Sequence, residues 1–212
     1  MITEYQLQHK PTAQAVWICR HGERIDQVDP TWRQRNGHDP HLSDKGIRQA
    51  IATGTRLQGE GIQRVFASPF LRTVETAHHI ADVLDLPVHI EQGLTEWLNP
   101  RWFAQMPSVL SPADVSQRFP RVEPDYASLV LSHYPETGDQ AFARAGRAAR
   151  LLAERTKDNL LLVGHGHSVQ GMAWGLLRAR PTVHAEMCAL IKLGRQGTVW
   201  RLQLDGDTSH LP

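Results

Sequence analysis

The fold is decided by the stretch Ala15-Val16-Trp17-Ile18-Cys19-Arg20-His21-Gly22-Glu23. Its first five residues are apolar and favour a strand, as expected for the buried centre of a parallel sheet. Arg20 and His21 follow at once, and Gly22 permits a sharp turn. We therefore expect a buried strand that ends by pointing an arginine and a histidine into a cleft. The alternative is a histidine at a loop start beside a surface arginine, and this stretch alone leaves both interpretations open.

The rest of the chain alternates between buried strands and amphipathic helices. Strands are expected at Val16–Cys19, Val65–Ala67, Val88–Ile90 and Leu160–Val163. Apolar residues recur with the helical period in four sets: Ile47, Ala50, Ile51, Gly54 and Leu57; Val74, Ala77, Ala81 and Leu84; Phe142, Ala145, Ala149 and Leu152; Val169, Met172, Ala173 and Leu176. Ser43 fits the N-cap of the first helix, and Pro87 follows the end of the second. This alternation predicts an α/β fold, a three-layer sandwich with a mainly parallel central sheet flanked by helices.

The C-terminal part predicts a β-hairpin. Two β-prone runs, Cys188–Leu193 and Thr198–Leu204, flank Gly194-Arg195-Gln196-Gly197, which we interpret as the turn. Apolar and polar residues alternate in the second run, which is typical of an edge strand with one solvated face. We expect the hairpin at the sheet edge. There it could pair with another chain, although nothing else in the sequence favours an oligomer.

Residues 99–138 form an irregular excursion, which holds six of the 13 prolines and shows little periodicity. In a compact domain such a stretch is usually a lid, a binding excursion or a set of short helices. We expect it to cover the site at the strand ends and to determine specificity.

Composition narrows the class of protein. The 212 residues fit one domain, 1–212. With 23 Lys and Arg against 22 Asp and Glu, the net charge of +1 offers no basic field for nucleic acid. Cys19 and Cys188 lie in apolar runs and are interpreted as buried hydrophobic residues. No apolar run approaches the roughly 18 residues of a membrane span, and the N-terminus lacks a signal-peptide pattern. We expect a cytoplasmic protein with neither nucleic acid nor membrane as a partner.

Polar side chains gather where the four expected strands end. They are Arg20, His21 and Arg24 after the first strand, Arg72 within Ser68-Pro69-Phe70-Leu71-Arg72-Thr73, Glu96 within Gly93-Leu94-Thr95-Glu96-Trp97, and His165 within Gly164-His165-Gly166-His167-Ser168. In open α/β sheets the ligand crevice lies outside the carboxyl ends of the strands. Because polar side chains follow all four strands, we favour a functional site over a purely structural role for these residues.

These groups suit phosphoryl transfer. Three guanidinium groups, those of Arg20, Arg24 and Arg72, could surround one phosphate and neutralise its oxygens. A neutral imidazole can attack phosphorus and form a phosphohistidine, and nearby arginines oppose its protonation. His165 can donate a hydrogen bond to the same oxygens. A carboxylic acid must then protonate the leaving oxygen and later activate water.

The motifs and their order resemble the histidine phosphatase superfamily, branch 1, whose members are phosphoglycerate-mutase-like. The resemblance rests on Arg20-His21-Gly22-Glu23, Leu42-Ser43-Asp44-Lys45-Gly46, Ser68-Pro69 with Arg72 and Thr76-Ala77, the Glu96 loop, and Val163-Gly164-His165-Gly166. It implies that His21 is the nucleophile, that Arg20, Arg72 and His165 form the phosphate pocket, and that Glu96 is the general acid and base. It also implies that neither a metal nor another cofactor takes part.

The acid has other candidates in the sequence, namely Glu23, Glu91 and Asp139. The family places its acid in a Gly-Leu-x-Glu context after the third strand, and Gly93-Leu94-Thr95-Glu96 fits this pattern. A different branch uses an aspartate directly after the late histidine. Here Gly166 follows His165, which excludes that option.

The residue after Arg20-His21-Gly22-Glu23 helps to indicate which members of the family the chain resembles most. Mutases of the family have a serine where this chain has Arg24. Arg-His-Gly-Glu-Arg-x-Asp together with Gly-Leu-x-Glu-Trp is similar to the branch that contains the T-cell ubiquitin ligand phosphatases and the ecdysteroid-phosphate phosphatase. There the extra arginine joins the phosphate pocket, and we interpret Arg24 in this way; the alternative is a salt-bridged rim residue. Trp97, Trp102 and Phe103 could wall the site for an aryl or steroid group, or simply pack in the core.

The expected function is therefore hydrolysis of a small-molecule or aryl phosphate through a phosphohistidine, without a metal. The alternatives are phosphoglycerate-mutase-type transfer and an inactive sensor of a phosphorylated ligand. His167 forms a His-x-His pair with His165, but no carboxylates at matching spacing support a metal site. Asp39, His41 and His38 could edge the cleft, and helix capping explains Asp39–Ser43 equally well.

Overall fold

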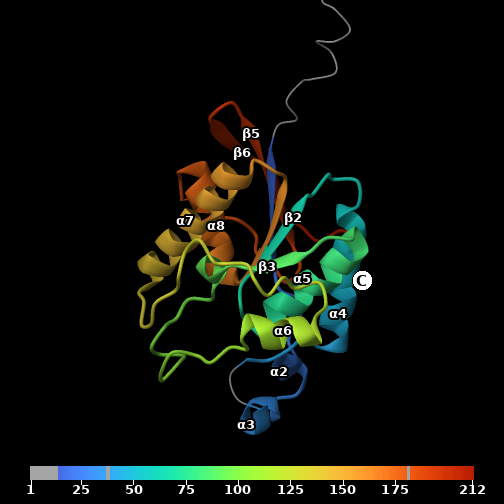
Figure 1. The fold of residues 1–212 in the computed structure, drawn as a ribbon, viewed down its shortest axis with the longest axis vertical. Helices are drawn as coiled ribbons and strands as arrows, with labels where there is room; N and C mark the ends of the chain where they lie inside the picture. The colour runs from blue at the N-terminus through green and yellow to red at the C-terminus, as the bar shows by residue number, and fades with distance from the viewer. Residues whose placement is uncertain (1–13, 37–38, 181) are drawn as a thin grey trace, which may run out of the picture.

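The computed structural model describes residues 14–36, 39–180 and 182–212, and strands alternate with helices along it (Figure 1). The elements are β1 Ala15–Arg20, α2 Ile25–Val28, α3 Trp32–Asn36, α4 Asp44–Leu57, β2 Arg64–Ala67, α5 Leu71–Leu84, β3 Val88–Ile90, the 3₁₀ helix η1 Gln92–Leu94, α6 Pro112–Arg118, α7 Gly138–Thr156, β4 Leu160–Gly164, α8 Gly166–Leu177, β5 Leu190–Gln196 and β6 Val199–Asp207. The four predicted strands and four predicted helices are all present.

The strands of the described ranges form one sheet in the order β3-β2-β4-β1-β5-β6. The pairs β3/β2, β2/β4 and β4/β1 are parallel, whereas β5 is antiparallel to β1 and β6 is antiparallel to β5. The predicted fold class is confirmed, including the hairpin at the sheet edge. β1 and β4 lie side by side with Arg20 opposite Gly164, so the segments that follow these two strands emerge together.

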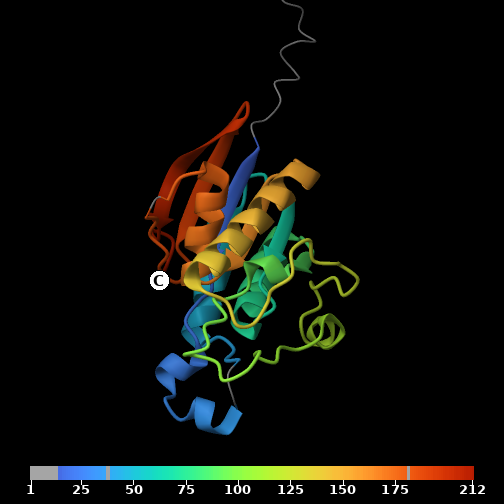
Figure 2. The same ribbon diagram turned by 90° about the vertical axis from the view of Figure 1, so that its left-hand side faces the viewer.

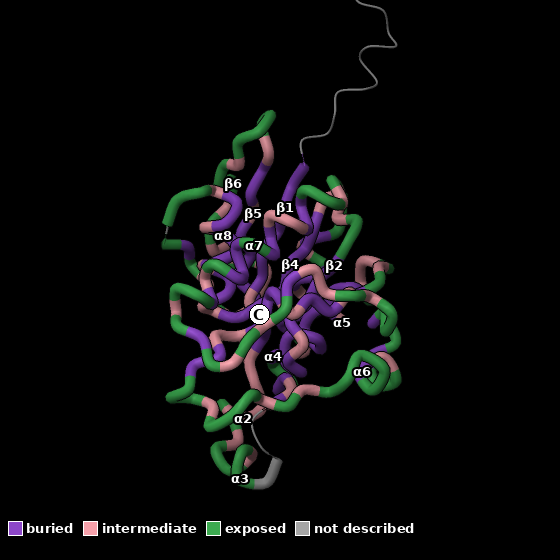
Figure 3. Tube along the Cα trace, turned by 60° about the vertical axis from the view of Figure 1, so that its left-hand side comes forward, coloured by how far each residue is buried: buried purple, intermediate pink, exposed green. Residues whose placement is uncertain are grey.

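Helices cover both faces of the sheet, which gives the three layers (Figure 2). α4 and α5 pack on the face that presents Trp17 and Cys19, and α7 and α8 pack on the face that presents Val16 and Ile18. This alternation along β1 follows from the two-residue period of a strand. Figure 3 shows the central strands β1 and β4 and the inner sides of these helices as mostly buried, with α3, α6 and the hairpin tip exposed.

Two details of the sequence interpretation are wrong. Gly194 belongs to β5 rather than to the turn, because it pairs with Arg201 of β6, and its lack of a side chain leaves room for Gln203. The turn is made instead by Gly197 at φ +61°. Ile51 is 43% exposed, because it lies beside the buried face of α4, to which Ala50 and Leu57 belong.

Residues 99–138 contain the short helix α6 and otherwise irregular backbone. The short helices α2 and α3 after β1 were not indicated by periodicity. Cys19 and Cys188 are fully buried free thiols, as expected. Within the described residues no helix is long and apolar enough to cross a membrane.

Candidate active site

The four strand-end motifs meet at one end of the sheet. Backbone hydrogen bonds tie them together: His21 N donates to Gly164 O at 3.0 Å, and Ser68 N donates to Val163 O at 3.1 Å. Glu91 N donates to Ala67 O at 2.9 Å and fixes the chain after β3 beside β2. The structure thereby brings together Arg20, His21, Arg72, Glu96 and His165, and Arg24 borders a cavity that Arg72 and Glu96 also line.

The His21 imidazole is buried, with 1% of its surface exposed. Burial lowers its pKa well below the ordinary histidine value, and the positive charges of Arg72 and Arg20 lower the pKa further. Nδ1 lies 2.8 Å from the carbonyl oxygen of Gly22. Because a carbonyl only accepts, Nδ1 carries the proton and Nε2 keeps its lone pair. The geometry therefore provides a neutral imidazole with a nucleophilic Nε2.

His165 lies edge-on to His21, with 5.4 Å between the ring centroids. Its Nε2 lies 2.8 Å from Ser68 Oγ, and its Nδ1 lies 3.5 Å from Glu96 Oε2. Burial and the charge of Arg72 lower the pKa of His165 well below its usual range. Because the Glu96 carboxylate opposite Nδ1 only accepts, Nδ1 carries the proton and Ser68 donates to Nε2; at 3.5 Å from Glu96, Nδ1 makes no hydrogen bond within the described part of the chain. His165 thus offers a buried, unused donor beside His21.

Arg20 and Arg72 also hold unused donors, because the buried Nε of each has no hydrogen-bond partner among the described residues. Arg20 Nη1 donates to Ala185 O at 3.1 Å. Arg72 is 4% exposed and its guanidinium lies 4.6 Å from the centre of the Phe70 ring. A buried donor without an acceptor costs about 1–3 kcal/mol. The unpaired donors of Arg20, Arg72 and His165 are therefore what a bound anion would satisfy.

The sequence offers four carboxylates as the acid, and within the described residues only Glu96 contacts both Arg72 and His165. Its Oε2 lies 3.4 Å from Arg72 Nη2 and 3.5 Å from His165 Nδ1. The other three candidates are engaged elsewhere. Glu91 is fully buried and accepts from Gly93 N, Tyr126 OH, Leu129 N and Val130 N; Glu23 pairs with Ser43 and Lys45; Asp139 pairs with Arg180 at the surface.

The loop that carries Glu96 is clamped by Arg144, a residue that the sequence analysis missed. Arg144 of α7 is 7% exposed and donates to the backbone carbonyls of Gly93, Thr95 and Glu96 at 2.9, 3.0 and 3.1 Å. It also forms a buried ion pair with Glu136. The signal was present, because Arg144 occupies the apolar face of its helix, where a charge is stable only when it is paired.

The loop that carries His21 rests on the start of α4. Ser43 caps this helix as predicted, accepting from Gly46 N at 3.1 Å. Ser43 N donates to Glu23 O at 2.9 Å, and a Cβ on Gly46 would lie 2.1 Å from the same oxygen. The two backbones therefore touch, which only glycine at this position allows. This contact accounts for the Leu42–Gly46 motif.

Arg24 lines a cavity of about 360 Å³ together with Arg33, Arg72, Glu96, Trp102 and Phe103. Its Nε and Nη2 lie 2.8 and 3.3 Å from the two oxygens of Asp26, which also pairs with Arg33 at 2.5 Å. Arg24 thus has a feature of each sequence interpretation, since it is ion-paired and also borders the cavity. That it binds phosphate stays a prediction.

Of the three aromatic residues after the acid, Trp102 and Phe103 line this cavity, whereas Trp97 is not part of its lining and packs against Trp102. The Trp97 ring stacks on His167 at 4.9 Å, and its Nε1 donates to Glu136 O at 2.9 Å. His167 in turn lies 2.9 Å from Gly138 O and has a packing role. The described residues contain no group of three or more His, Cys, Asp or Glu suited to a metal ion.

Asp39 borders the site as well as capping a helix. Its carboxylate accepts from Leu71 N at 2.9 Å at the start of α5, and it lies 3.7 Å from Arg72 Nη1. Burial raises the pKa of Asp39 to about 6, against the opposing effect of Arg72. His41 Nδ1 lies 2.6 Å from Leu42 O, and His38 lies outside the described residues.

Comparison with known proteins agrees with this geometry. The family described as histidine phosphatase superfamily (branch 1) matches residues 16–208. Ubiquitin-associated and SH3 domain-containing protein A of Mus musculus is 34% identical over 133 residues, which are 46% of this chain and 21% of that protein. The chain therefore matches only about a fifth of that relative's length.

A probable phosphoglycerate mutase GpmB of Yersinia enterocolitica is 28% identical over 214 residues and is covered almost end to end, with 92% of this chain and 94% of that one. Among solved structures, the ecdysone phosphate phosphatase of Bombyx mori in complex with tungstate superposes with a TM-score of 0.78. The superposition covers 94% of this chain and 93% of that one at 24% identity, which shows a common fold.

Proposed function

The chain belongs to the histidine phosphatase superfamily (branch 1), and from this premise we propose that it hydrolyses a small-molecule or aryl phosphate monoester through a phosphorylated His21, without a metal. The observation that carries the proposal is the set of buried donors without acceptors, Arg20 Nε, Arg72 Nε and His165 Nδ1, beside a neutral imidazole. Donors of this kind match a phosphate dianion, and guanidinium groups match it best.

The proposed reaction has two steps. In the first, His21 Nε2 attacks phosphorus, the ester P–O bond breaks, and Glu96 gives its proton to the leaving oxygen. Arg20, Arg72 and His165 neutralise the charge that spreads over the other phosphoryl oxygens. In the second step, Glu96 takes a proton from water, whose oxygen attacks phosphorus and breaks the P–N bond. Inorganic phosphate leaves, and His21 is again neutral.

A phosphatase is favoured over a mutase by Arg24. A mutase must retain and reorient a phosphorylated sugar acid, and Arg24 replaces the serine that serves this purpose in mutases. Arg24 and Arg33 instead border the cavity beside Trp102 and Phe103, a combination that suits a phosphate attached to an apolar group. One relative is named for ecdysteroid phosphate, which has this character.

The proposal is tested with His21→Ala and a matched control, His133→Ala, which changes an exposed histidine. We expect His21→Ala to abolish hydrolysis of 4-nitrophenyl phosphate and acid-labile phosphoryl labelling, while the control keeps both. Full activity in His21→Ala would refute the mechanism. Tight phosphate binding by the wild type with no hydrolysis across a substrate panel would indicate an inactive sensor instead.

Phosphoglycerate-mutase activity is the second candidate, supported by the relative from Yersinia enterocolitica that the chain covers almost end to end. It requires interconversion of phosphoglycerates that depends on catalytic amounts of 2,3-bisphosphoglycerate. Interconversion faster than phosphate release would replace the phosphatase proposal.

A further inference from the structure

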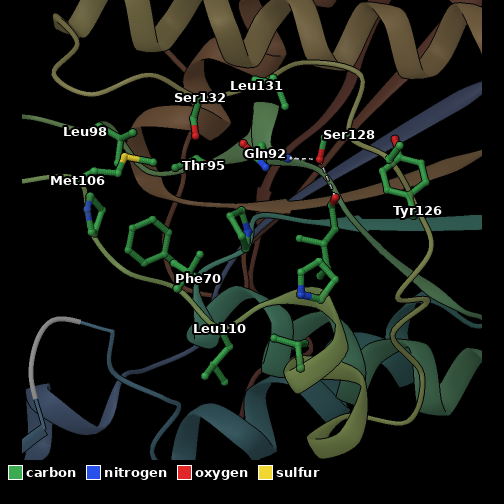
Figure 4. A pocket seen from close by; sticks show the side chains of 17 residues that line it. Phe70, Gln92, Thr95, Leu98, Met106, Leu110, Tyr126, Ser128, Leu131 and Ser132 are labelled. Atoms are coloured by element: carbon green, nitrogen blue, oxygen red, sulfur yellow. Dashed lines mark hydrogen bonds between the residues drawn. The ribbon is translucent and has the colours of Figure 1, made fainter.

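A second cavity, of about 320 Å³, lies between the excursion at residues 99–138 and the start of α5 (Figure 4). Its size falls within the range of about 300–1,000 Å³ for ligand pockets. The figure shows Leu98 and Met106 on one side, Tyr126 on the other, and Phe70 and Leu110 below them. None of the described residues that line it is charged, whereas the cavity that Arg24 lines is bordered by two further arginines and Glu96.

The rim of this uncharged cavity exposes apolar side chains to solvent. Met106, Leu110 and Leu131 line it and are 47%, 42% and 57% exposed. Single exposed apolar residues are common, but several gathered at one hollow mark a binding site. The lining also includes Thr95, which is 2% exposed and whose Oγ1 has no hydrogen-bond partner among the described residues. A mainly apolar ligand with one polar group would satisfy both features.

The uncharged cavity and the phosphate site share the Phe70 ring as a wall. Phe70 lines the uncharged cavity, and its ring centre lies 4.6 Å from the Arg72 guanidinium and 5.4 Å from the His165 ring. It also lies 6.2 Å from the ring of Phe103, which lines the cavity bordered by Arg24, Arg72 and Glu96. Thr95 makes a second link, because it directly precedes Glu96. A charged compartment and an uncharged one thus adjoin each other.

We infer that the substrate is an amphiphilic phosphate monoester, whose phosphate lies at His21 and whose aliphatic hydrocarbon group occupies the uncharged cavity. The inference rests on the proposed function and specifies its substrate class. The lining favours an aliphatic group, because aliphatic side chains such as Leu98, Leu110 and Leu131 outnumber the two aromatic ones, and methionine adapts to irregular shapes.

The test is a series of n-alkyl phosphates of increasing chain length, with 4-nitrophenyl phosphate as the reference. We expect kcat/KM to rise with chain length until the cavity is filled. The largest expected rise in kcat/KM is about 4-fold per methylene, the ratio that corresponds to about 0.8 kcal/mol for each buried CH₂.

Two variants test whether the cavity causes this rise. Leu110→Asp places a charge on the cavity wall, and Ala127→Trp fills the cavity from its exposed side. Each should flatten the rise, lowering kcat/KM for octyl phosphate by about 10-fold or more relative to kcat/KM for ethyl phosphate.

Ile51→Asp is the matched control, because Ile51 is 43% exposed on α4, outside the cavity. It should preserve the chain-length dependence. If Leu110→Asp and Ile51→Asp behave alike, or if chain length has no effect while the reference is hydrolysed, the inference is wrong. The same assay is run with 1-octanol added to the reaction of 4-nitrophenyl phosphate. If 1-octanol changes this rate while chain length has no effect on kcat/KM, the cavity binds a separate apolar ligand and the inference is wrong.

Binding of alkylphosphonates, which cannot be hydrolysed, separates the two proposals. Calorimetry should show octylphosphonate binding at least about 10-fold more tightly than ethylphosphonate, with the difference lost in Leu110→Asp. This outcome would support the cavity assignment even if no phosphate ester were hydrolysed. Equal affinities would refute the cavity assignment whether or not the chain is a phosphatase.

Discussion

Arg144 Nη2 donates to the backbone carbonyl of Glu96 at 3.1 Å, so a residue of α7 fixes the loop that holds the expected acid. The same guanidinium reaches two further carbonyls of this loop and pairs with Glu136. Glu136 Oε1 in turn accepts from Leu98 N at 3.0 Å, on the far side of Glu96. The backbone that carries the Glu96 carboxyl is therefore held in place by a buried network.

Arg144→Lys should impair the reaction of esters that need a proton on the leaving oxygen. Lysine keeps the positive charge beside Glu136 but lacks the planar fork that reaches three carbonyls. We expect kcat for an alkyl phosphate to fall about 10–100-fold, and kcat for 4-nitrophenyl phosphate, whose phenolate leaves without a proton, to fall far less. Arg147→Lys, an exposed change on the same helix, is the control. Equal losses on both esters would indicate a merely structural role for Arg144.

Glu96→Gln and Glu91→Gln should have opposite consequences. Loss of the Glu96 proton should lower kcat for alkyl phosphates by about 10²–10⁴ with little change in stability. Glu91 accepts four hydrogen bonds in the interior, and an amide nitrogen in place of one oxygen would face donors. Glu91→Gln should therefore cost about 1–3 kcal/mol in urea denaturation while leaving kcat of the folded protein within a few-fold. The reverse pattern would assign the acid to Glu91.

The sequence predicts the sheet because each strand is a short apolar run, and Arg20 and His165 stand at the ends of such runs. Arg72 and Glu96 lie several residues beyond their strands, and Glu96 was separated from the other carboxylates only by the Gly-Leu-x-Glu context of the family that the chain resembles. The place of Arg144 on the apolar face of its helix indicates a paired charge but not its partners, because the three carbonyl acceptors lie about 50 positions away in the chain and backbone acceptors carry no sequence signal.

The sequence does not predict the uncharged cavity either. Its lining comes from α5, from the segments around Glu96, and from an excursion without periodicity, so no local pattern marks it. The turn of the hairpin is misplaced by the sequence for a similar reason. Gly194 indicates a turn when only its neighbours in the chain are considered, whereas in the structure it provides room for the side chain of Gln203 on the next strand.

Asp39 should make anion binding depend on pH. Its pKa of about 6 exceeds the value of about 3.9 for an exposed aspartate, so the folded protein favours the protonated form. The stability that this group contributes is complete below about pH 3.9 and is lost as the pH rises through about 6. Above that pH, a carboxylate 3.7 Å from Arg72 competes with a bound dianion.

Competitive inhibition by sulfate checks this prediction, because sulfate stays a dianion throughout the range. The inhibition constant of the wild type should rise several-fold between about pH 5 and pH 7.5, whereas Asp39→Asn should show no such rise and bind sulfate more tightly at the higher pH. Identical profiles for the two proteins would show that Asp39 does not control the charge of the site.

Gly46→Ala should damage the site from outside it. A Cβ at this position would lie 2.1 Å from Glu23 O, a backbone atom in the loop that carries His21, so α4 and the loop must move apart. Near-attack geometry tolerates little displacement, and a shift of about 1 Å can cost about 100-fold in rate. We expect kcat/KM to fall at least about 10-fold, with a lower unfolding temperature. Gly138→Ala is the matched control, because its Cβ would meet no atom closer than 3.5 Å and should leave activity unchanged. Wild-type activity in Gly46→Ala would mean that the loop does not depend on α4 for its position.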